Sequence, residues 1–427
     1  MQSVLFIVQN LPVPQDRRVW MEARALKKEG YTVSVISPSF NFSKQKKFRK
    51  IKGINVYQFK NYYQPGRFLG YFIEYAYSLF RIGILTLKVY FKHNFSVIHV
   101  ANPPDLLFLI ALPFKLLGVK FVYDQHDLNP ELLKNKFADK SQKKLALFYK
   151  VLLWLEKISL KICDLHITPS KSAQKITLKR NKFKAVSVIV RNAVFRNGNR
   201  DKIDKRYLRK VKKFKYVCAY LGVMGSQDGL RNLIRIIDHI VNDHKRSDIG
   251  FVLMGDGDEL SVVKKRAKKL KLNNNIVFTG WADEKMKNTF LNNADLGLMP
   301  DPKNDHSTNS LHNKVLEYME SGLPFVSFDL AETKMIAKKA VIQIKNNNEK
   351  RFAKAVIDLI NNTKQRKALG KYAQKRVLTK GYTWNESTKN LRLYYKNLLD
   401  SKETQKSFFK GPLYQECYKK GLIEIKN

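Results

Sequence analysis

Short apolar segments alternate with longer amphipathic segments along most of the chain. Two apolar runs, SVLFIVQN (3–10) and YTVSVISP (31–38), flank DRRVWMEARALKKEG (16–30), where apolar residues recur with helical spacing. The alternation starts again at FKYVCAYLG (214–222) and continues to LPFVSFD (323–329). Strand and helix patterns that alternate in this way indicate βαβ units and parallel sheets. We therefore predict an α/β protein with two doubly wound domains.

A polar and basic stretch without apolar periodicity separates the two series. It reads RNGNRDKIDKRYLRKVKK (196–213), which predicts a linker between an N-terminal domain (1–195) and a C-terminal domain (214–384). Beyond Trp384, the segment NESTKNLRLYYKNLL (385–399) has the pattern of an amphipathic helix.

The segment HNKVLEYMESGLPFVSFD (312–329) combines a helical pattern, a stop signal and a strand. Apolar positions from Leu311 to Met319 fall on one helix face, whereas Glu317 falls on another. Gly322 and Pro324 are typical of the end of a helix. A glutamate in this place is most simply a solvated helix residue. The pattern alone leaves a binding role open.

The chain carries a large positive charge. Of 427 residues, 80 are Lys or Arg and 36 are Asp or Glu, which gives a net charge of +44. Such a charge attracts an anionic membrane surface or a nucleic acid, but a Lys- and Asn-rich composition also explains it. The aromatic and basic segment 67–94 favours the membrane. The basic run KKRAKKLK (264–271) lacks the interleaved aromatic residues expected for nucleic-acid binding.

Cysteine usage and hydropathy bear on the compartment. The three cysteines, Cys163, Cys218 and Cys417, are far apart and fit neither a metal site nor a disulfide framework. The first residues form an apolar strand pattern rather than a signal peptide. The most apolar stretch (105–123) is interrupted by Pro113 and two lysines, so we expect no transmembrane helix. We predict a cytoplasmic protein, peripheral on the inner face of the cell membrane.

Candidate chemistry lies in loops that follow the predicted strands. In LGVMGSQDGL (221–230), Gly222 and Gly225 permit close backbone approach to a phosphate, although a plain turn also needs glycines. In VYDQHDLNPEL (122–132), His126 stands between carboxylates at a strand end, which suits either an acid–base role or a structural role.

The run GDGDE (255–259) contains an Asp-x-Asp pair of the kind that can hold a divalent metal. No other acidic loop converges on it by spacing, so we favour a turn and expect no metal site.

Several segments together resemble the retaining glycosyltransferases of the GT4 family (glycosyltransferase group 1 type), which have the GT-B fold. They are VLFIVQNLPVPQDRRVWMEARALKKEGYTVSVIS (4–37), VYDQHDLNPEL, VIVRNAVF (188–195), VFTGWADEKM (277–286) and NKVLEYMESGLPFVS (313–327). The likeness covers about residues 1–395. It implies two Rossmann-like domains that face a cleft, with a C-terminal helix that crosses back to the N-domain.

The resemblance also implies roles for individual residues. Glu317 matches the second glutamate of the family's E-x7-E motif, which bonds the ribose of the donor nucleotide. The first glutamate is replaced by Asn309, which would orient the sugar hydroxyls. His126 would bond the transferred sugar, so His126 and Asn309 are the implied catalytic residues. The implied donor-binding residues are Glu317, Lys314, Gly222, Gly225, Ser310 and Trp281.

One departure concerns the diphosphate. Where the family has Arg and Lys in G-R-L-x-x-x-K-G, this chain has Val223 and Asp228. Either backbone N–H groups near Gly225 and Ser310, together with Lys314, hold the phosphates, or activity is lost. Arg17 or Arg18 in the first loop would meet phosphate or acceptor.

The function implied by the resemblance is transfer of a hexosyl or N-acetylhexosaminyl group. The donor is a nucleotide diphosphate sugar, the acceptor a lipid-linked or growing cell-surface glycan, and the anomeric configuration is retained. No bound cofactor is expected, and the partners are donor, acceptor and an anionic membrane. A hydrolysing sugar-nucleotide epimerase of the same fold is the first alternative. A nucleic-acid-binding or glycan-binding protein without activity is the second.

Overall fold

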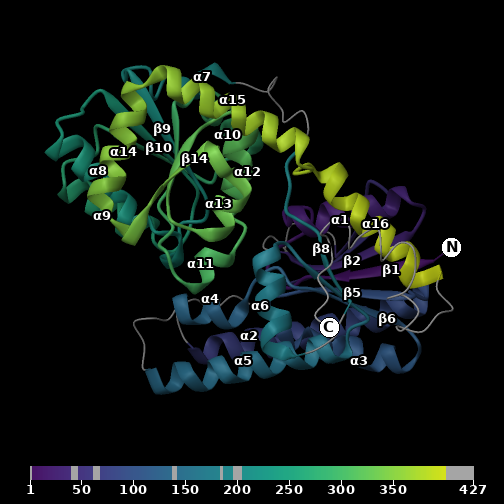
Figure 1. Ribbon diagram of the computed structural model, residues 1–427. Coiled ribbons are helices and arrows are strands. Elements are labelled where there is room, and N and C mark those ends of the chain that lie inside the picture. Colours follow the sequence, from purple (N-terminus) through teal and green to yellow (C-terminus); the bar gives the residue numbers. More distant parts are fainter. Residues whose placement is uncertain are drawn as a thin grey trace. The chain divides into compact units, whose positions relative to one another are not determined.

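The computed structural model describes residues 2–39, 47–60, 68–136, 142–182, 186–195 and 204–400. The chain forms two compact units (Figure 1). Unit 1 contains Met1–Arg191 and Asn385–Asn427, and unit 2 contains Asn192–Trp384. Both units have the α/β architecture that the alternating pattern predicts.

The predicted linker belongs partly to unit 2. Residues 196–203 lie outside the described residues, but 204–213 include the short helix α7 (Lys205–Leu208). Tyr207, Leu208 and Val211 pack in a hydrophobic core of unit 2. Their helical spacing is obscured by the surrounding basic residues, so the prediction of a linker is wrong for 204–213.

Unit 1 contains an eight-stranded sheet in the order β3-β4-β2-β1-β5-β6-β7-β8. All its strand pairs are parallel except β3 and β4. The strand order reverses between β1 and β5, which is where ligands bind in open sheets of this kind. The strands are β1 (Ser3–Ile7), β2 (Thr32–Ser39), β3 (Phe48–Ile51), β4 (Ile54–Lys60), β5 (Val97–Ala101), β6 (Lys120–Asp124), β7 (Leu165–Thr168) and β8 (Ser187–Ile189).

Successive side chains of a strand point to opposite faces of the sheet, and the strands carry apolar side chains on both faces. Helices cover both of these faces. Val4 and Phe6 of β1 pack in a core with α1 (Arg17–Lys28) and α16 (Trp384–Asp400). Leu5 and Ile7 pack in a second core with α2 (Phe68–His93), α3 (Phe108–Leu116) and α5 (Gln142–Ile162). The remaining helices are η1 (Asp105–Leu107), α4 (Asn129–Lys136) and α6 (Lys171–Asn181).

The C-terminal helix packs in the first of these cores. Leu391, Tyr394 and Tyr395 of α16 are buried there beside Val19, Ala23 and Leu26 of α1. The expected return of the C-terminal helix to the N-terminal domain is therefore confirmed. In the described part of the chain, no helix has both the length and the apolar character required to cross a bilayer.

Unit 2 contains a six-stranded sheet in the order β11-β10-β9-β12-β13-β14, and all its strand pairs are parallel. The order reverses between β9 and β12. The strands are β9 (Tyr216–Leu221), β10 (Ile249–Met254), β11 (Ile276–Gly280), β12 (Leu296–Met299), β13 (Phe325–Phe328) and β14 (Val341–Ile344).

The sheet of unit 2 is also covered on both faces. Cys218 and Tyr220 of β9 pack in a core with α8 (Leu230–Asp238), α9 (Leu260–Lys269) and α14 (Glu349–Asn361). Val217 and Ala219 pack with α10 (Glu284–Asn293), α12 (Asn313–Glu320), α13 (Ala331–Ala337) and α15 (Thr363–Thr379). The shorter elements are η2 (Ser226–Asp228), η3 (His239–Asp243), α11 (Asp305–Asn309), η4 (Lys338–Ala340) and η5 (Lys345–Asn347).

Candidate functional site

Asp124, the last residue of β6, joins the polar groups of unit 1. Its Oδ1 accepts a hydrogen bond from Arg18 Nη2 at 2.7 Å, and its Oδ2 accepts one from Arg18 Nε at 3.0 Å. His126 Nε2 lies 2.7 Å from the same Oδ2. Burial acts to raise the pKa of Asp124, but the charge of Arg18 and the hydrogen bond from His126 outweigh it and hold the pKa well below its usual value. Asp124 is thus an ionised, fully buried acceptor.

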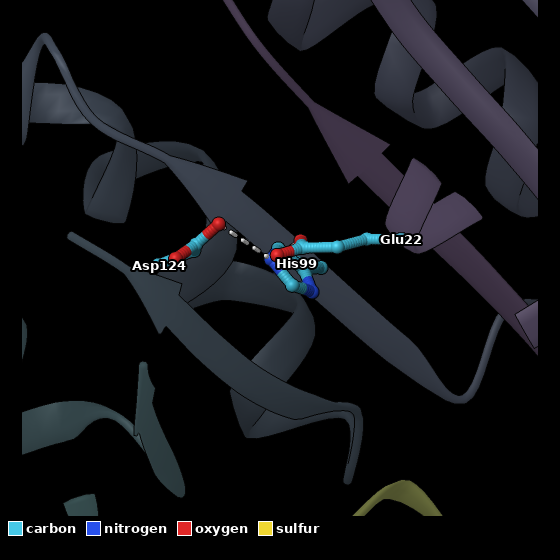
Figure 2. Close-up of side chains that lie close together, drawn as sticks. All are labelled: Glu22, His99 and Asp124. Atoms are coloured by element: carbon cyan, nitrogen blue, oxygen red, sulfur yellow. Dashed lines mark ion pairs between the residues drawn. The ribbon is translucent and has the colours of Figure 1, made fainter. Parts of the chain in front are cut away.

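A second buried carboxylate lies beside this pair. Figure 2 shows Glu22 and Asp124 with the imidazole of His99 between them. His99 Nε2 is 3.5 Å from Glu22 Oε2 and 3.5 Å from Asp124 Oδ2. Burial raises the pKa of Glu22 well above its usual value and lowers the pKa of His99. These shifts favour the uncharged forms of Glu22 and His99, and Arg18 is the main counter-charge of the ionised Asp124.

Glu22, His99 and Asp124 are close enough to share a metal ion. However, Arg18 Nη2 lies 3.3 Å from Glu22 Oε1 and 2.7 Å from Asp124 Oδ1. The guanidinium already supplies the positive charge, and a divalent cation beside it would be repelled. The cluster therefore fits a network of buried charged groups better than a metal centre.

The C-terminal helix completes the network and determines its tautomers. Tyr395 of α16 places its hydroxyl 2.6 Å from His99 Nδ1. Burial raises the pKa of Tyr395, so the phenol keeps its proton. His99 Nε2 faces the two carboxylates, which favours a proton on that nitrogen, and Nδ1 then accepts a hydrogen bond from the phenol. His126 likewise donates its Nε2 proton, because the ionised Asp124 can only accept.

This arrangement leaves the other ring nitrogen of His126 for a ligand. His126 Nδ1 makes no hydrogen bond to the described residues, and the side chain is partly exposed. The backbone is fixed as well, since His126 N donates to Asn102 Oδ1 at 2.7 Å. Asn102 follows β5 and is held by Asp105, whose Oδ1 accepts from Asn102 Nδ2 at 2.8 Å. A histidine held in this way can bond a sugar hydroxyl through Nδ1.

In unit 2, the loop after β9 approaches the loop after β12. Gly229 has φ of +71°, and a Cβ there would lie 2.1 Å from the carbonyl oxygen of Pro300. A Cβ at Gly222 would lie 3.2 Å from Lys314 Cε. Gly229 and Gly222 therefore allow Pro300 and Lys314 to approach the loop closely at the point where the strand order reverses. In the same loop, Gly225 N donates to Asp228 Oδ2 at 3.2 Å.

Lys314 is the buried cation of this site. Its Nζ donates to both carboxylate oxygens of Asp301 at 2.9 Å and lies 4.9 Å from the centre of the Tyr220 ring. Burial raises the pKa of Asp228 to about 7; Lys314 opposes this rise and Asp301 adds to it. The ammonium group of Lys314 thus faces two carboxylates, those of Asp301 and Asp228. A phosphate-binding site would instead need a net positive charge.

Comparison with known families decides the class of protein. A model described as Glycosyltransferase Family 4 matches residues 15–194, and one described as Glycosyl transferases group 1 matches residues 200–376. The chain belongs to the GT4-type glycosyltransferases. The resemblance in the sequence is thereby confirmed, with a match in each of the two units.

Two curated relatives of this glycosyltransferase illustrate the range of the family. An uncharacterized glycosyltransferase of Methanocaldococcus jannaschii is 23% identical over 389 residues, which cover 87% of this chain and 91% of the relative. The chitobiosyldiphosphodolichol beta-mannosyltransferase of Candida albicans is 24% identical over 280 residues, which cover 62% of this chain and 59% of the relative.

Solved structures share the GT-B fold of this glycosyltransferase. Sucrose-phosphate synthase of Thermosynechococcus elongatus has a TM-score of 0.76 at 14% identity and covers 94% of this chain and 100% of its own. HepE of Anabaena in complex with UDP-glucose has a TM-score of 0.67 at 14% identity and covers 93% of this chain and 100% of its own. At such identities the likeness concerns the fold alone.

One expectation about the donor site of the glycosyltransferase needs correction. Backbone N–H groups of a helix start were expected near Ser310, but the chain forms two helices there, α11 and α12, and α12 begins at Asn313. Ser310 is the C-cap of α11, and its hydroxyl donates to the carbonyl oxygen of His306 at 2.8 Å. Ser310 therefore stands at a carbonyl end and cannot offer the free N–H groups of a helix start.

Asn309 and Trp281 lie in different surroundings. Asn309 Nδ2 donates to the carbonyl oxygen of Asp305 within α11 at 2.8 Å. Trp281 follows β11 directly and is 74% exposed, so its indole is available to a ligand. Neither Asn309 nor Trp281 forms a hydrogen bond with Lys314 among the described residues.

Glu317 is not a solvated helix residue. Its side chain is buried, and Oε1 accepts a hydrogen bond from Lys287 Nζ of α10 at 2.8 Å. The sequence places Glu317 on the polar face of α12, but the packing of α10 against that face could not be read from it.

Arg17 and Arg18 are not in a loop. They begin α1, which Asp16 caps by accepting a hydrogen bond from Val19 N. Arg18 is buried in the network around Asp124, and its expected contact with phosphate or acceptor stays a prediction. Asp301 and Tyr395 were not predicted from the sequence. Asp301 could have been found, because it stands just beyond β12 in a loop at the carboxyl edge of the sheet.

Proposed function

We propose that this glycosyltransferase moves a hexosyl or N-acetylhexosaminyl group from a nucleotide diphosphate sugar to a lipid-linked or growing glycan with retention of configuration. The observation that carries the proposal is the orientation of His126, whose Nε2 proton is committed to Asp124 at 2.7 Å. Its Nδ1 then accepts a hydrogen bond from a sugar hydroxyl, and this bond orients the transferred sugar. The nucleotide sugar is the substrate, and no resident cofactor is proposed.

Unit 2 supplies the groups proposed for the nucleotide. The leaving diphosphate gains charge as the glycosidic bond breaks, and fixed donors stabilise that charge. We assign this role to Lys314, which is held in place by Asp301, and we propose that Gly222 and Gly225 let the diphosphate approach the loop closely. Glu317 is proposed for the ribose hydroxyls, because a carboxylate accepts two hydrogen bonds.

Names of relatives support the choice of substrates for a first test. The HepE structure was obtained with UDP-glucose, and the Candida albicans relative is named for a diphosphodolichol-linked acceptor. UDP-sugars and polyprenyl-diphosphate-linked oligosaccharides are therefore the first donors and acceptors to examine. A lipid-linked acceptor lies in a membrane, and we propose that membrane surface as a further partner of the protein.

The test is a screen of nucleotide sugars for thermal stabilisation, followed by transfer assays with the stabilising donors. A bound donor raises the melting temperature by mass action. The proposal expects sugar transfer only when acceptor is present, and a product whose anomeric coupling in proton NMR matches that of the donor. Turnover of donor without acceptor would indicate the hydrolysing epimerase. Donor binding without transfer to any acceptor would indicate a protein that has lost activity through Val223 and Asp228.

A further inference from the structure

Helix α2 has apolar residues on two opposite faces. Ile82 and Val89 point to the core of unit 1. Five exposed residues recur at intervals of seven, four, three and four positions and so form one stripe on the outer face: Ile73, Phe80, Ile84, Leu87 and Phe91. Phe91 is 84% exposed. A helix that only covers a sheet needs the inner stripe and not the outer one.

The neighbouring helices repeat this pattern. On α3, Leu109, Leu112 and Leu116 are exposed at helical spacing, and Leu116 is 83% exposed. On α5, the corresponding outer residues are Leu147, Val151 and Trp154. Of 19 exposed large hydrophobic side chains in the described residues, 12 lie on α2, on α5, or on α3 and its C-cap residue Leu117. Their concentration on three helices requires an explanation.

The three helices form one layer. All of them contribute to the same core on one face of the sheet, opposite α1 and α16 (Figure 1). Helices α2 and α3 approach closely, because a Cβ at Gly83 would lie 3.6 Å from Ile110 Cδ1. Helix α5 is joined to η1, which leads directly into α3, through Ser159, whose hydroxyl donates to the carbonyl oxygen of Asp105 at 3.4 Å. Their outer sides together make one surface, called here the outer helical face.

Basic residues accompany the apolar ones. On α5, Lys143, Lys150, Lys157 and Lys161 are exposed and lie on one side of the apolar stripe. On α2, Lys88 and Lys92 are exposed and Arg81 is partly exposed. These three helices contain two acidic residues among those described, Glu74 and Glu156, and both are buried. The outer helical face is therefore apolar and positive, without exposed negative charge on its described helical residues.

We propose that the outer helical face docks on an anionic lipid bilayer. The proposal deepens the proposed function, because it names the surface on which a lipid-linked acceptor would be met. Aromatic and aliphatic side chains enter the interfacial region, while the lysines contact the phosphates of anionic head groups. A second copy of this chain fits less well, because two such faces would bring like charges together. A nucleic acid fits less well, because the apolar stripes would meet phosphate.

Vesicle sedimentation at low salt tests the proposal. The full chain is expected to bind vesicles of phosphatidylcholine mixed with phosphatidylglycerol. It is not expected to bind vesicles that contain only phosphatidylcholine. Phe80→Ser combined with Phe91→Ser and Leu116→Ser removes apolar contacts, and Lys150→Gln combined with Lys157→Gln and Lys161→Gln removes charge. Each triple variant is expected to bind mixed vesicles about tenfold to a hundredfold more weakly.

A matched control changes exposed residues of unit 2. Val262→Ser with Leu378→Ser, and Lys264→Gln with Lys265→Gln, should bind mixed vesicles like the parent. Trp154 provides a second readout, because its fluorescence should be quenched by brominated lipid and Trp154→Phe should remove that quenching. Equal binding to both vesicle types, or unchanged binding of both triple variants, would overturn the proposal. A dimer in size-exclusion chromatography that only the triple serine variant dissociates would also overturn the proposal, because the outer helical face would then bind a second copy of the chain.

Donor binding is measured on the same variants by thermal shift. It should be unchanged in both triple variants, which also shows that they fold. If mixed vesicles are bound through this face while no nucleotide sugar stabilises the protein, the docking surface stands and the proposed transfer reaction fails. If nucleotide sugars bind and vesicles do not, the reaction stands and the docking surface fails.

Discussion

The candidate sites of the two units hold buried charge in different ways. In unit 1, the ionised Asp124 is paired with Arg18, and burial favours the protonated form of Glu22, so Arg18 has its main counter-charge within the network. In unit 2, Asp228 and Asp301 compete for Lys314, and the pKa of Asp228 rises to about 7. The comparison indicates that unit 1 is preorganised to fix one histidine, whereas unit 2 leaves a carboxylate that titrates near neutral pH.

The largest effect is expected from Asp124→Asn. This change leaves the Arg18 guanidinium buried without its main counter-charge and removes the strong acceptor that orients His126. We expect a loss of about 3–5 kcal/mol in the free energy of unfolding, measured with urea. The matched change in unit 2, Asp301→Asn, leaves Asp228 to pair with Lys314 and should cost less. Equal losses at the two positions would show that the two networks do not differ.

A large effect on donor affinity is expected from Glu317→Gln. A charged hydrogen bond to the ribose is worth about 1.5–3 kcal/mol, which corresponds to roughly tenfold to a hundredfold in affinity measured by calorimetry. Deoxyribose analogues should then lose little further affinity on the variant. Because Glu317 also pairs with Lys287, Lys287→Met serves as the control and should keep the preference for the ribose hydroxyls. If Glu317→Gln binds donor like the parent, the carboxylate has only a structural role.

Donor binding should depend on pH through Asp228. Its pKa of about 7 means that the carboxyl is mostly protonated at lower pH and mostly anionic at higher pH. The anion repels the diphosphate, so nucleoside diphosphate affinity should fall by up to about tenfold between pH 6 and pH 8. Asp228→Asn should remove most of this dependence. A pH profile that the asparagine leaves unchanged would place Asp228 away from the diphosphate.

The smallest effect is expected from Tyr395→Phe. It removes one buried hydrogen bond to His99 and should lower the free energy of unfolding by about 1 kcal/mol. It also frees the His99 tautomer, so the pH profile of transfer should shift while donor affinity stays constant. An unchanged pH profile would limit Tyr395 to a packing role. Tyr394→Phe on the same helix is the matched control, because no hydrogen bond joins it to His99.

Much of the fold follows from local pattern, whereas most side-chain partners do not. The strands and the helices around them appear as apolar alternation and helical spacing, so both doubly wound units and the amphipathic helix α16 were predictable. The break between α11 and α12 was not, because Ser310 adopts an extended conformation inside a stretch that reads as one helix. Arg18 and Asp124 are 106 positions apart, and His99 and Tyr395 are 296 apart, so only the folded chain reveals these pairs.

In the proposed function, His126 of unit 1 contacts the transferred sugar and not the nucleotide. His126→Ala tests it most directly when transfer and nucleoside diphosphate affinity are measured on the same preparation. The account predicts that transfer falls by about 10²- to 10⁴-fold while the affinity from calorimetry stays within a factor of two to three of the parent. Equal loss of nucleoside diphosphate affinity, or normal transfer, would contradict it.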